Sequence, residues 1–175
     1  FKFPSNYPSQ PPIVTYHTND GITRFNPNLY RSGKVCISIL NTWKGPQWTS
    51  CQNISSILLS LCASVLTDTP LLNEPGISIN HPDYDNYNKI ITYKNYEIAI
   101  ADIIINNKVK NNFPELYEII HKNFLKNYND ILFNLEKNIN LNDEIVETQL
   151  YKMKIKTSYK NIKNKIEEIY KLLKN

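Results

Sequence analysis

The sequence predicts an α+β domain, with short strands in its N-terminal part and amphipathic helices in the remainder. Two observations support this fold class. Apolar and polar residues alternate in residues 13–18 and 35–40, which is the period of a strand. Beyond residue 53, apolar residues recur every three or four positions, which is the period of a helix with one buried face.

The N-terminal segments follow each other as strand, turn and strand. Residues 1–4 end a first strand, and the prolines in 7–12 require extended or turn backbone. Residues 13–18 form a second strand, and Asn19-Asp20-Gly21 is a turn signal. Residues 35–40 form a further strand, in which one face points into the core and the other presents Cys36.

Helices are predicted after this strand. Thr49 followed by Gln52 predicts a capping box, which would open a helix with a buried stripe of Ile54, Ile57, Leu58, Leu61, Cys62, Val65 and Leu66. Residues 67–88 form a long loop, 95–105 a helix, 106–112 a break, and Pro114 the first turn of another helix. A second break at 138–143 precedes a C-terminal amphipathic helix that carries Ile155, Tyr159, Ile162, Ile166, Ile169, Tyr170 and Leu173.

Composition excludes several functional classes. The 175 residues suffice for one domain with a sizeable core, and the formal net charge is +4. Lysines concentrate after about residue 107 but alternate with Glu and Asn, which favours a solvated helix face over a nucleic-acid surface. No apolar run is long enough to span a membrane, and no secretory signal opens the chain. We therefore expect neither nucleic acid nor membrane as a partner.

The cysteines and histidines predict a reducing, intracellular setting without a metal. Three cysteines, at 36, 51 and 62, form no CxxC pair and no even framework of disulfides. His17, His81 and His121 lack the spacing of zinc ligands, so we expect no metal or other cofactor. A lone intracellular cysteine is most often a small buried apolar residue, and this interpretation applies to Cys36 until its neighbours are considered.

The neighbours of Cys36 carry a specific motif. A proline-rich segment precedes it, an Asn-Pro-Asn turn ends eight residues before it, a glycine stands three residues before it, and tryptophans follow. The motif residues are Phe3, Pro4, Tyr7, Pro8, Pro11, Pro12, Asn26, Pro27, Asn28, Gly33, Cys36, Trp43 and Trp48. Together they resemble the catalytic core of the ubiquitin-conjugating enzymes over roughly residues 1–125. Asn26 stands where the family usually has His.

Two further stretches refine the resemblance. Residues 33–43, Gly-Lys-Val-Cys-Ile-Ser-Ile-Leu-Asn-Thr-Trp, and residues 73–76, Asn-Glu-Pro-Gly, are most similar to the large hybrid conjugating-enzyme/ligase subfamily. The implied fold is an antiparallel meander sheet backed by helices. Its N-terminal helix and first strand are missing from this chain, and we expect them upstream in the parent protein. Residues 1–137 would then form the N-terminally incomplete catalytic core, and residues 138–175 a C-terminal helical extension.

The resemblance implies a reaction and assigns roles to three residues. Cys36 carries ubiquitin as a thioester, which a lysine amine of the substrate attacks. Asn28 matches the position proposed to donate to the oxyanion, although its amide could equally pin the turn against the backbone. Glu74 is the best match for the carboxylate that orients the amine and accepts its proton, with Asp68 as the alternative. Cys51 and Cys62 lack the motif.

The implied partners are ubiquitin, the ubiquitin-activating enzyme and a substrate lysine, in the cytoplasm or the nucleus. A ubiquitin ligase is an optional partner, because Ser9 departs from the bulky residue that many relatives use to contact one. Two alternatives stay open. The chain could be a non-catalytic ubiquitin-binding scaffold of the same fold, or it could transfer a ubiquitin-like modifier.

Overall fold

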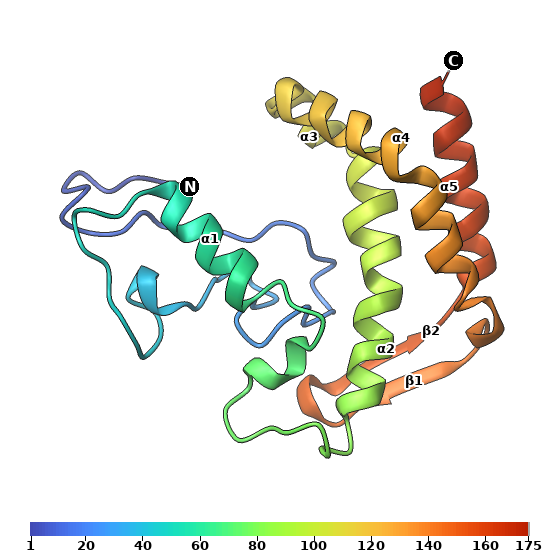
Figure 1. Cartoon of the computed structure of the whole chain (residues 1–175), viewed down its shortest axis with the longest axis horizontal. Coiled ribbons are helices and arrows are strands. Elements are labelled where there is room, and N and C mark those ends of the chain that lie inside the picture. The colour runs from blue at the N-terminus through green and yellow to red at the C-terminus, as the bar shows by residue number, and fades with distance from the viewer. Residues whose placement is uncertain (175) are drawn as a thin grey trace. The chain divides into compact units, whose positions relative to one another are not determined.

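The computed structural model describes residues 1–174, and the chain forms two compact units, Phe1–Asn88 and Lys89–Asn175 (Figure 1). The first unit contains the 3-10 helix η1 (Ser38–Leu40), helix α1 (Ile54–Ser64) and the 3-10 helix η2 (Pro70–Asn73). Helix α2 (Tyr84–Lys94) begins in the first unit and ends in the second. No helix in the described part of the chain is long and apolar enough to cross a membrane.

The strands expected in the first unit are reduced to isolated bridges. Lys2 pairs with Ile13, Thr15 with Lys34, and Leu29 with Val35, each by a single antiparallel bridge. The predicted strand 35–40 ends early, because Ser38–Leu40 turns into η1 and Asn41 closes it with a φ of 57°. The expected meander sheet is therefore not formed by these residues, since a ladder needs partner strands along its whole length.

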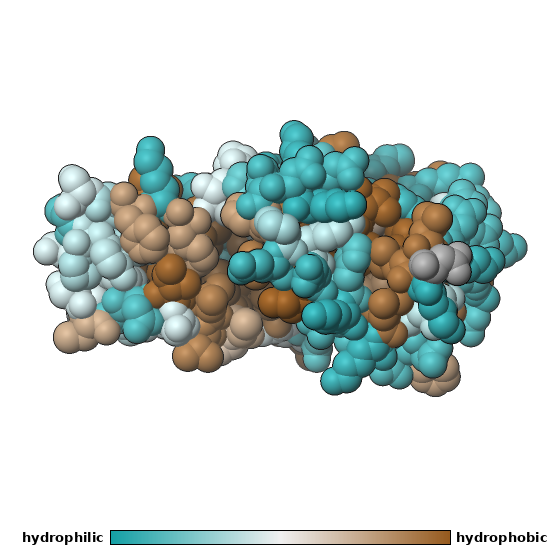
Figure 2. All heavy atoms as spheres, turned by 90° about the horizontal axis from the view of Figure 1, so that it is seen from above, coloured by the Kyte–Doolittle hydropathy of each residue, from teal (hydrophilic) through white to brown (hydrophobic). Residues whose placement is uncertain are grey.

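The core of the first unit gathers around the segment that carries Cys36. Its buried apolar residues are Leu29, Val35, Ile37, Ile39, Leu40, Trp48, Ile57 and Val65. Helix α1 contributes only Ile57 from its own length to the fully buried set. The side chains of Leu58 and Leu59 on this helix are exposed. Figure 2 shows that apolar areas lie among the polar ones on the molecular surface.

Helix α1 begins later than the sequence predicted. Its N-cap is Asn53, whose side chain accepts from the Ser56 amide at 3.2 Å, while the Ser56 hydroxyl accepts from the Asn53 amide at 3.4 Å. Thr49 and Gln52 do bond to each other, but they form the turn that precedes the helix. The predicted capping box was wrong because Asn53 is the stronger N-cap and lies directly before the apolar stripe.

The second unit is mainly helical. After α2 the chain winds as the π-helix η3 (Asn95–Asp102) and the short helix α3 (Asn107–Asn112). Helix α4 (Pro114–Glu136) starts at the predicted proline, and the 3-10 helix η4 (Ile139–Leu141) follows it. The predicted break at 106–112 was wrong, because Asn106 caps α3 by accepting from the Lys108 amide.

A hairpin replaces the first part of the predicted C-terminal helix. Strands β1 (Ile145–Thr148) and β2 (Met153–Lys156) pair antiparallel around the 3-10 turn η5 (Leu150–Lys152), and helix α5 (Tyr159–Lys174) follows. In Figure 1, α5 runs beside α4, and these two helices are in contact. The rings of Tyr128 and Tyr170 stack at 3.6 Å between them.

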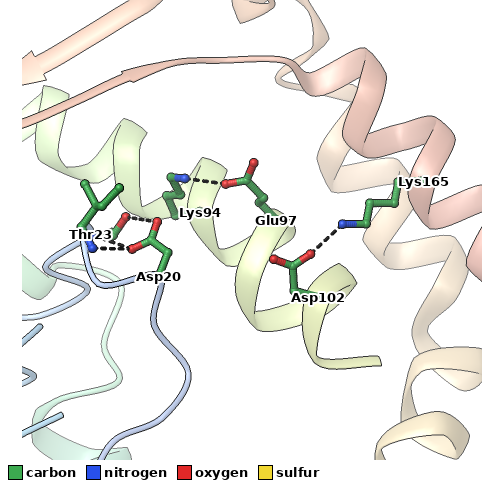
Figure 3. A network of polar contacts seen from close by, with 7 residues as sticks. Asp20, Thr23, Lys94, Glu97, Asp102 and Lys165 are labelled. Atoms are coloured by element: carbon green, nitrogen blue, oxygen red, sulfur yellow. Dashed lines mark hydrogen bonds and ion pairs between the residues drawn. The ribbon is translucent and has the colours of Figure 1, made fainter. Parts of the chain in front are cut away.

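Helix α5 is the best-predicted element of this unit, because its apolar stripe is the buried one. Tyr159, Ile162, Ile166 and Ile169 all lie in the core of the second unit. Ion pairs add to this packing: Lys165 of α5 bonds Asp102 of η3 at 2.6 Å, and Lys94 at the end of α2 bonds Glu97 of η3 at 2.5 Å (Figure 3).

Replacing Ile166 with alanine tests this packing. Ile166 is fully buried in the core of the second unit, and an isoleucine-to-alanine change in such a site costs about 2–5 kcal/mol. We expect the free energy of unfolding in urea to fall by this amount. The matched change Leu172→Ala, on an exposed residue of the same helix, should have little effect. Equal losses in the two variants would contradict the assigned core.

Candidate active site

Asn28 and Cys36 lie side by side, joined by two reciprocal hydrogen bonds. The Cys36 amide donates to the Asn28 carbonyl oxygen at 2.9 Å. In return, the Nδ2 group of Asn28 donates to the Cys36 carbonyl oxygen at 2.6 Å. Two residues eight positions apart are thereby fixed in register, and the structure brings these two predicted site residues together.

Gly33 allows the chain to turn between them. Its φ is +87°, a conformation that residues with a side chain rarely adopt. A Cβ atom at this position would lie 2.9 Å from the Tyr16 carbonyl oxygen, which is closer than carbon and oxygen normally approach. The glycine is therefore required by both the backbone angle and the space.

Asn26 holds the turn against two other segments. Its side chain is buried, its Nδ2 donates to the Val65 carbonyl oxygen at 2.8 Å, and its Oδ1 accepts from the Asn28 amide at 2.8 Å. The same Oδ1 accepts from Asn73 Nδ2 at 3.3 Å, and Asn73 also donates to the Ser64 carbonyl oxygen at 2.7 Å. Asn26 thus links the turn to the end of α1 and to the last residue of η2.

The three cysteines differ in exposure. Cys36 is 2% exposed, whereas Cys51 and Cys62 are exposed. The expectation that Cys62 packs in the core was wrong, because the stripe of α1 that carries Leu58 and Cys62 faces solvent. Cys51 lies before α1, outside the first turn of that helix.

The two tryptophans flank the site in different ways. Trp48 is buried, and its indole N–H donates to the Pro8 carbonyl oxygen at 2.8 Å. Trp43, by contrast, is 42% exposed. The difference arises because Trp48 is anchored by Pro8 and Asn41, while Trp43 lies on the exposed loop 41–47.

Thr42 fastens this loop to the segment that carries Cys36. Its hydroxyl accepts from the Ile37 amide at 3.0 Å and lies 3.1 Å from the carbonyl oxygens of both Val35 and Ile37, to either of which it can donate. The two residues that flank Cys36 are therefore both in contact with one hydroxyl. The sequence analysis did not single out this threonine, and a lone Thr in a loop carries no signal for such a role.

A polar cavity of about 260 Å³ opens beside Asn28. Small and polar side chains form most of its wall, and the lining residues are Asn28, Ile37, Ser38, Ile39, Trp43, Ser60, Ser64, Val65 and Asn73. The sequence analysis missed the serines, although Ser56, Ser60 and Ser64 recur at four-residue spacing and so share a face of α1.

Glu74 lies on the loop that borders this cavity. It follows η2 directly, is half-buried, and its neighbour Asn73 both lines the cavity and bonds Asn26. Neither Glu74 nor Asp68 lines the cavity itself, and Asp68 is exposed. Of the two predicted carboxylates, Glu74 is the one on a segment tied to the Asn26–Asn28 turn.

Arg24 and Tyr16 set the charge near the Asn26–Asn28 turn. The Arg24 guanidinium stacks 3.5 Å from the centre of the Tyr30 ring, and its Nη2 donates to the Pro27 carbonyl oxygen at 2.6 Å. Burial, and to a lesser extent the charge of Asp20, raises the pKa of the Tyr16 phenol above its usual value. This side of the site therefore holds a fixed cation and a neutral phenol at physiological pH.

Comparison with known proteins identifies the family of this site. The ubiquitin-conjugating enzyme family matches residues 1–95. The chain is 44% identical over 132 residues to Ubiquitin-conjugating enzyme E2 Z of Danio rerio, covering 73% of this chain and 39% of the relative. For the enzyme of the same name from Homo sapiens the identity is again 44%, over 36% of that relative.

A hybrid enzyme also matches, but less closely. The Dual E2 ubiquitin-conjugating enzyme/E3 ubiquitin-protein ligase BIRC6 of Homo sapiens is 37% identical over 128 residues, which is 70% of this chain and 3% of that protein. The chain thus spans well under half the length of these relatives. The hybrid type that the sequence motif favoured has the lower identity of the two.

Asn26→Ala tests how far the site depends on this one side chain. The change removes the partners of the Val65 carbonyl and the Asn28 amide, which should cost about 1–3 kcal/mol of unfolding free energy. Denaturant unfolding measures this loss, and Asn80→Ala, on an exposed residue of the same unit, is the control. If both variants unfold like the unchanged chain, Asn26 does not hold the turn.

Proposed function

Because the chain belongs to the ubiquitin-conjugating enzyme family, we propose that it carries ubiquitin as a thioester on Cys36 and transfers it to a lysine amine. The Cys36 thiol attacks the thioester of the charged activating enzyme, so that a new carbon–sulfur bond forms and the old one breaks. The substrate amine then attacks the carbonyl carbon, loses a proton, and displaces Cys36, which regains a proton.

The observation that carries this proposal is the pair of hydrogen bonds between Asn28 and Cys36. An asparagine Nδ2 group has two N–H donors. One donor is engaged by the Cys36 carbonyl oxygen at 2.6 Å, which fixes the side chain beside the cysteine. We assign the second donor to the oxyanion that forms when the amine attacks. A fixed donor of this kind is worth roughly 3–4 kcal/mol to the transition state.

The polar cavity suits the tail of the modifier. Its serine and asparagine side chains are small and offer hydrogen-bonding groups, which an extended polypeptide backbone needs when it is withdrawn from water. Asn28 lines the cavity and is hydrogen-bonded to Cys36, so a tail bound in the cavity could place its end beside Cys36. We therefore propose this cavity as the binding site for the C-terminal tail of ubiquitin.

Glu74 supplies the carboxylate in this proposal. The attacking lysine must lose a proton, and a carboxylate close to it orients the ammonium group and accepts that proton. Asn73 bonds to Asn26, which keeps the loop that bears Glu74 at the Asn26–Asn28 turn. We prefer Glu74 to Asp68 for this reason.

The burial of Cys36 favours a second candidate function. A thiol that is 2% exposed must become accessible before it can be charged. The segment we expect to move is the exposed loop 41–47. The Thr42 hydroxyl holds this loop to Val35 and Ile37, the two neighbours of Cys36. If the loop does not open, the chain would be a non-catalytic scaffold of the same fold that binds ubiquitin without carrying it.

Cys36→Ser separates the two functions. Serine in place of the cysteine should trap ubiquitin as an ester that resists thiol reductant, because an alkoxide is a poorer leaving group than a thiolate. The assay contains activating enzyme, ATP, ubiquitin and the chain, and is analysed on gels with and without reductant. Cys51→Ser and Cys62→Ser are the matched controls and should still form a labile thioester. A thioester that survives unchanged in Cys36→Ser would contradict the assignment.

Asn28→Ala tests the oxyanion donor. We expect the variant to be charged but to discharge to free lysine about 100- to 1000-fold more slowly, as in other sites that lose one such donor. The rate is measured by following a preformed thioester after the activating enzyme is stopped. The thermal midpoint is recorded alongside, because a purely structural role would lower it without this selective loss. Discharge at the unchanged rate would remove Asn28 from the mechanism.

A further inference from the structure

A second cleft, of about 690 Å³, is formed mainly by the loop 41–47. Its lining residues are Asn41, Thr42, Trp43, Lys44, Gln47 and Pro75. Trp43 lines both this cleft and the polar cavity beside Asn28, so the two hollows are neighbours that share one side chain. Thr42 connects the cleft to Cys36, because its hydroxyl contacts both residues that flank the cysteine.

Lys44 gives this cleft a positive charge. It is the one charged residue among the six that line the cleft, and its side chain is exposed. Within residues 1–174, the Lys44 ammonium group has no ion pair or hydrogen bond to another side chain. Trp43 and Pro75 add apolar surface to the same lining. The cleft therefore presents one uncompensated cation together with two apolar side chains.

We propose that this cleft binds the residues that flank the acceptor lysine, and that Lys44 selects acceptor polypeptides with an acidic residue beside that lysine. The inference rests on the proposed function, since an acceptor must approach a thioester on Cys36. An extended chain advances about 3.3 Å per residue, so the immediate neighbours of the acceptor lysine must lie on the surface around Cys36. The polar cavity is assigned to the ubiquitin tail, which leaves the cleft for the acceptor.

The charge decides which acceptors are preferred. A carboxylate next to the acceptor lysine would pair with Lys44, whereas a lysine or arginine there would be repelled. An exposed ion pair of this kind changes a rate by about threefold, and the preference should weaken as salt rises, because salt screens exposed charges. Reversal of the charge at position 44 should therefore reverse the preference.

The test compares two synthetic peptides in single-turnover discharge. Each peptide has one lysine, flanked on both sides by glutamate in one and by glutamine in the other. The charged chain should transfer ubiquitin to the glutamate peptide about threefold faster. Lys44→Ala should bring the ratio of the two rates to about one, and Lys44→Glu should turn it below one. Lys2→Glu, the same charge change on an exposed lysine outside the cleft, should keep the original ratio.

The possible failures are distinguishable. If no thioester forms on the unchanged chain, the proposed function is overturned and this inference with it. If the thioester forms but the two peptides react equally, or if Lys44→Glu keeps the preference, the inference alone is overturned. Mass spectrometry of the reacted chain covers one further outcome: ubiquitin attached to Lys44 would make this lysine an acceptor and would overturn its role in selection.

Discussion

The reciprocal hydrogen bonds between Asn28 and Cys36 are the constraint on which the rest of the site depends. They fix the backbone of the cysteine and the side chain of the asparagine at the same time. Asn26 stabilises this pair, because its side chain accepts a hydrogen bond from the Asn28 amide and donates one to the Val65 carbonyl at the end of α1. The usual histidine of the family is therefore replaced by a residue that makes its own set of contacts, and the turn is kept.

Two hollows meet at Trp43, one polar and one with a single cation. In our proposal the polar cavity receives the modifier and the cleft receives the acceptor, while the hydrogen bonds of Asn28 and Thr42 connect both hollows to the segment that carries Cys36. Cys36 is almost fully buried, and in the same proposal the loop 41–47 on the acceptor side also opens to admit the thioester. Selection of the acceptor and access to the Cys36 thiol would then both depend on residues 41–47.

Sequence reasoning succeeded where a local signal decides the structure. Pro114 begins α4, and the apolar spacing of α5 matches its buried face, because both depend on neighbouring residues alone. It failed where residues distant in the sequence determine the local structure. Residues 13–18 form only isolated bridges because they lack paired strands, and Cys62 faces solvent. The hairpin Ile145–Lys156 lies where the C-terminal helix was predicted to begin, and the hydrogen bond from Asn73 to Asn26 spans 47 positions. The motif around Cys36 singled out Asn28, which the structure places beside Cys36, but the serines of α1 and Thr42 were identified only from the folded chain.

The central claim is that ubiquitin is carried on Cys36. The most direct measurement is peptide mapping by mass spectrometry of the unchanged chain after charging, with digestion in acid so that the thioester survives. We predict that the tail of ubiquitin is found on the peptide that contains Cys36. Ubiquitin on the peptide of Cys51 or Cys62, or no adduct on any cysteine while the activating enzyme itself is charged, would contradict the account.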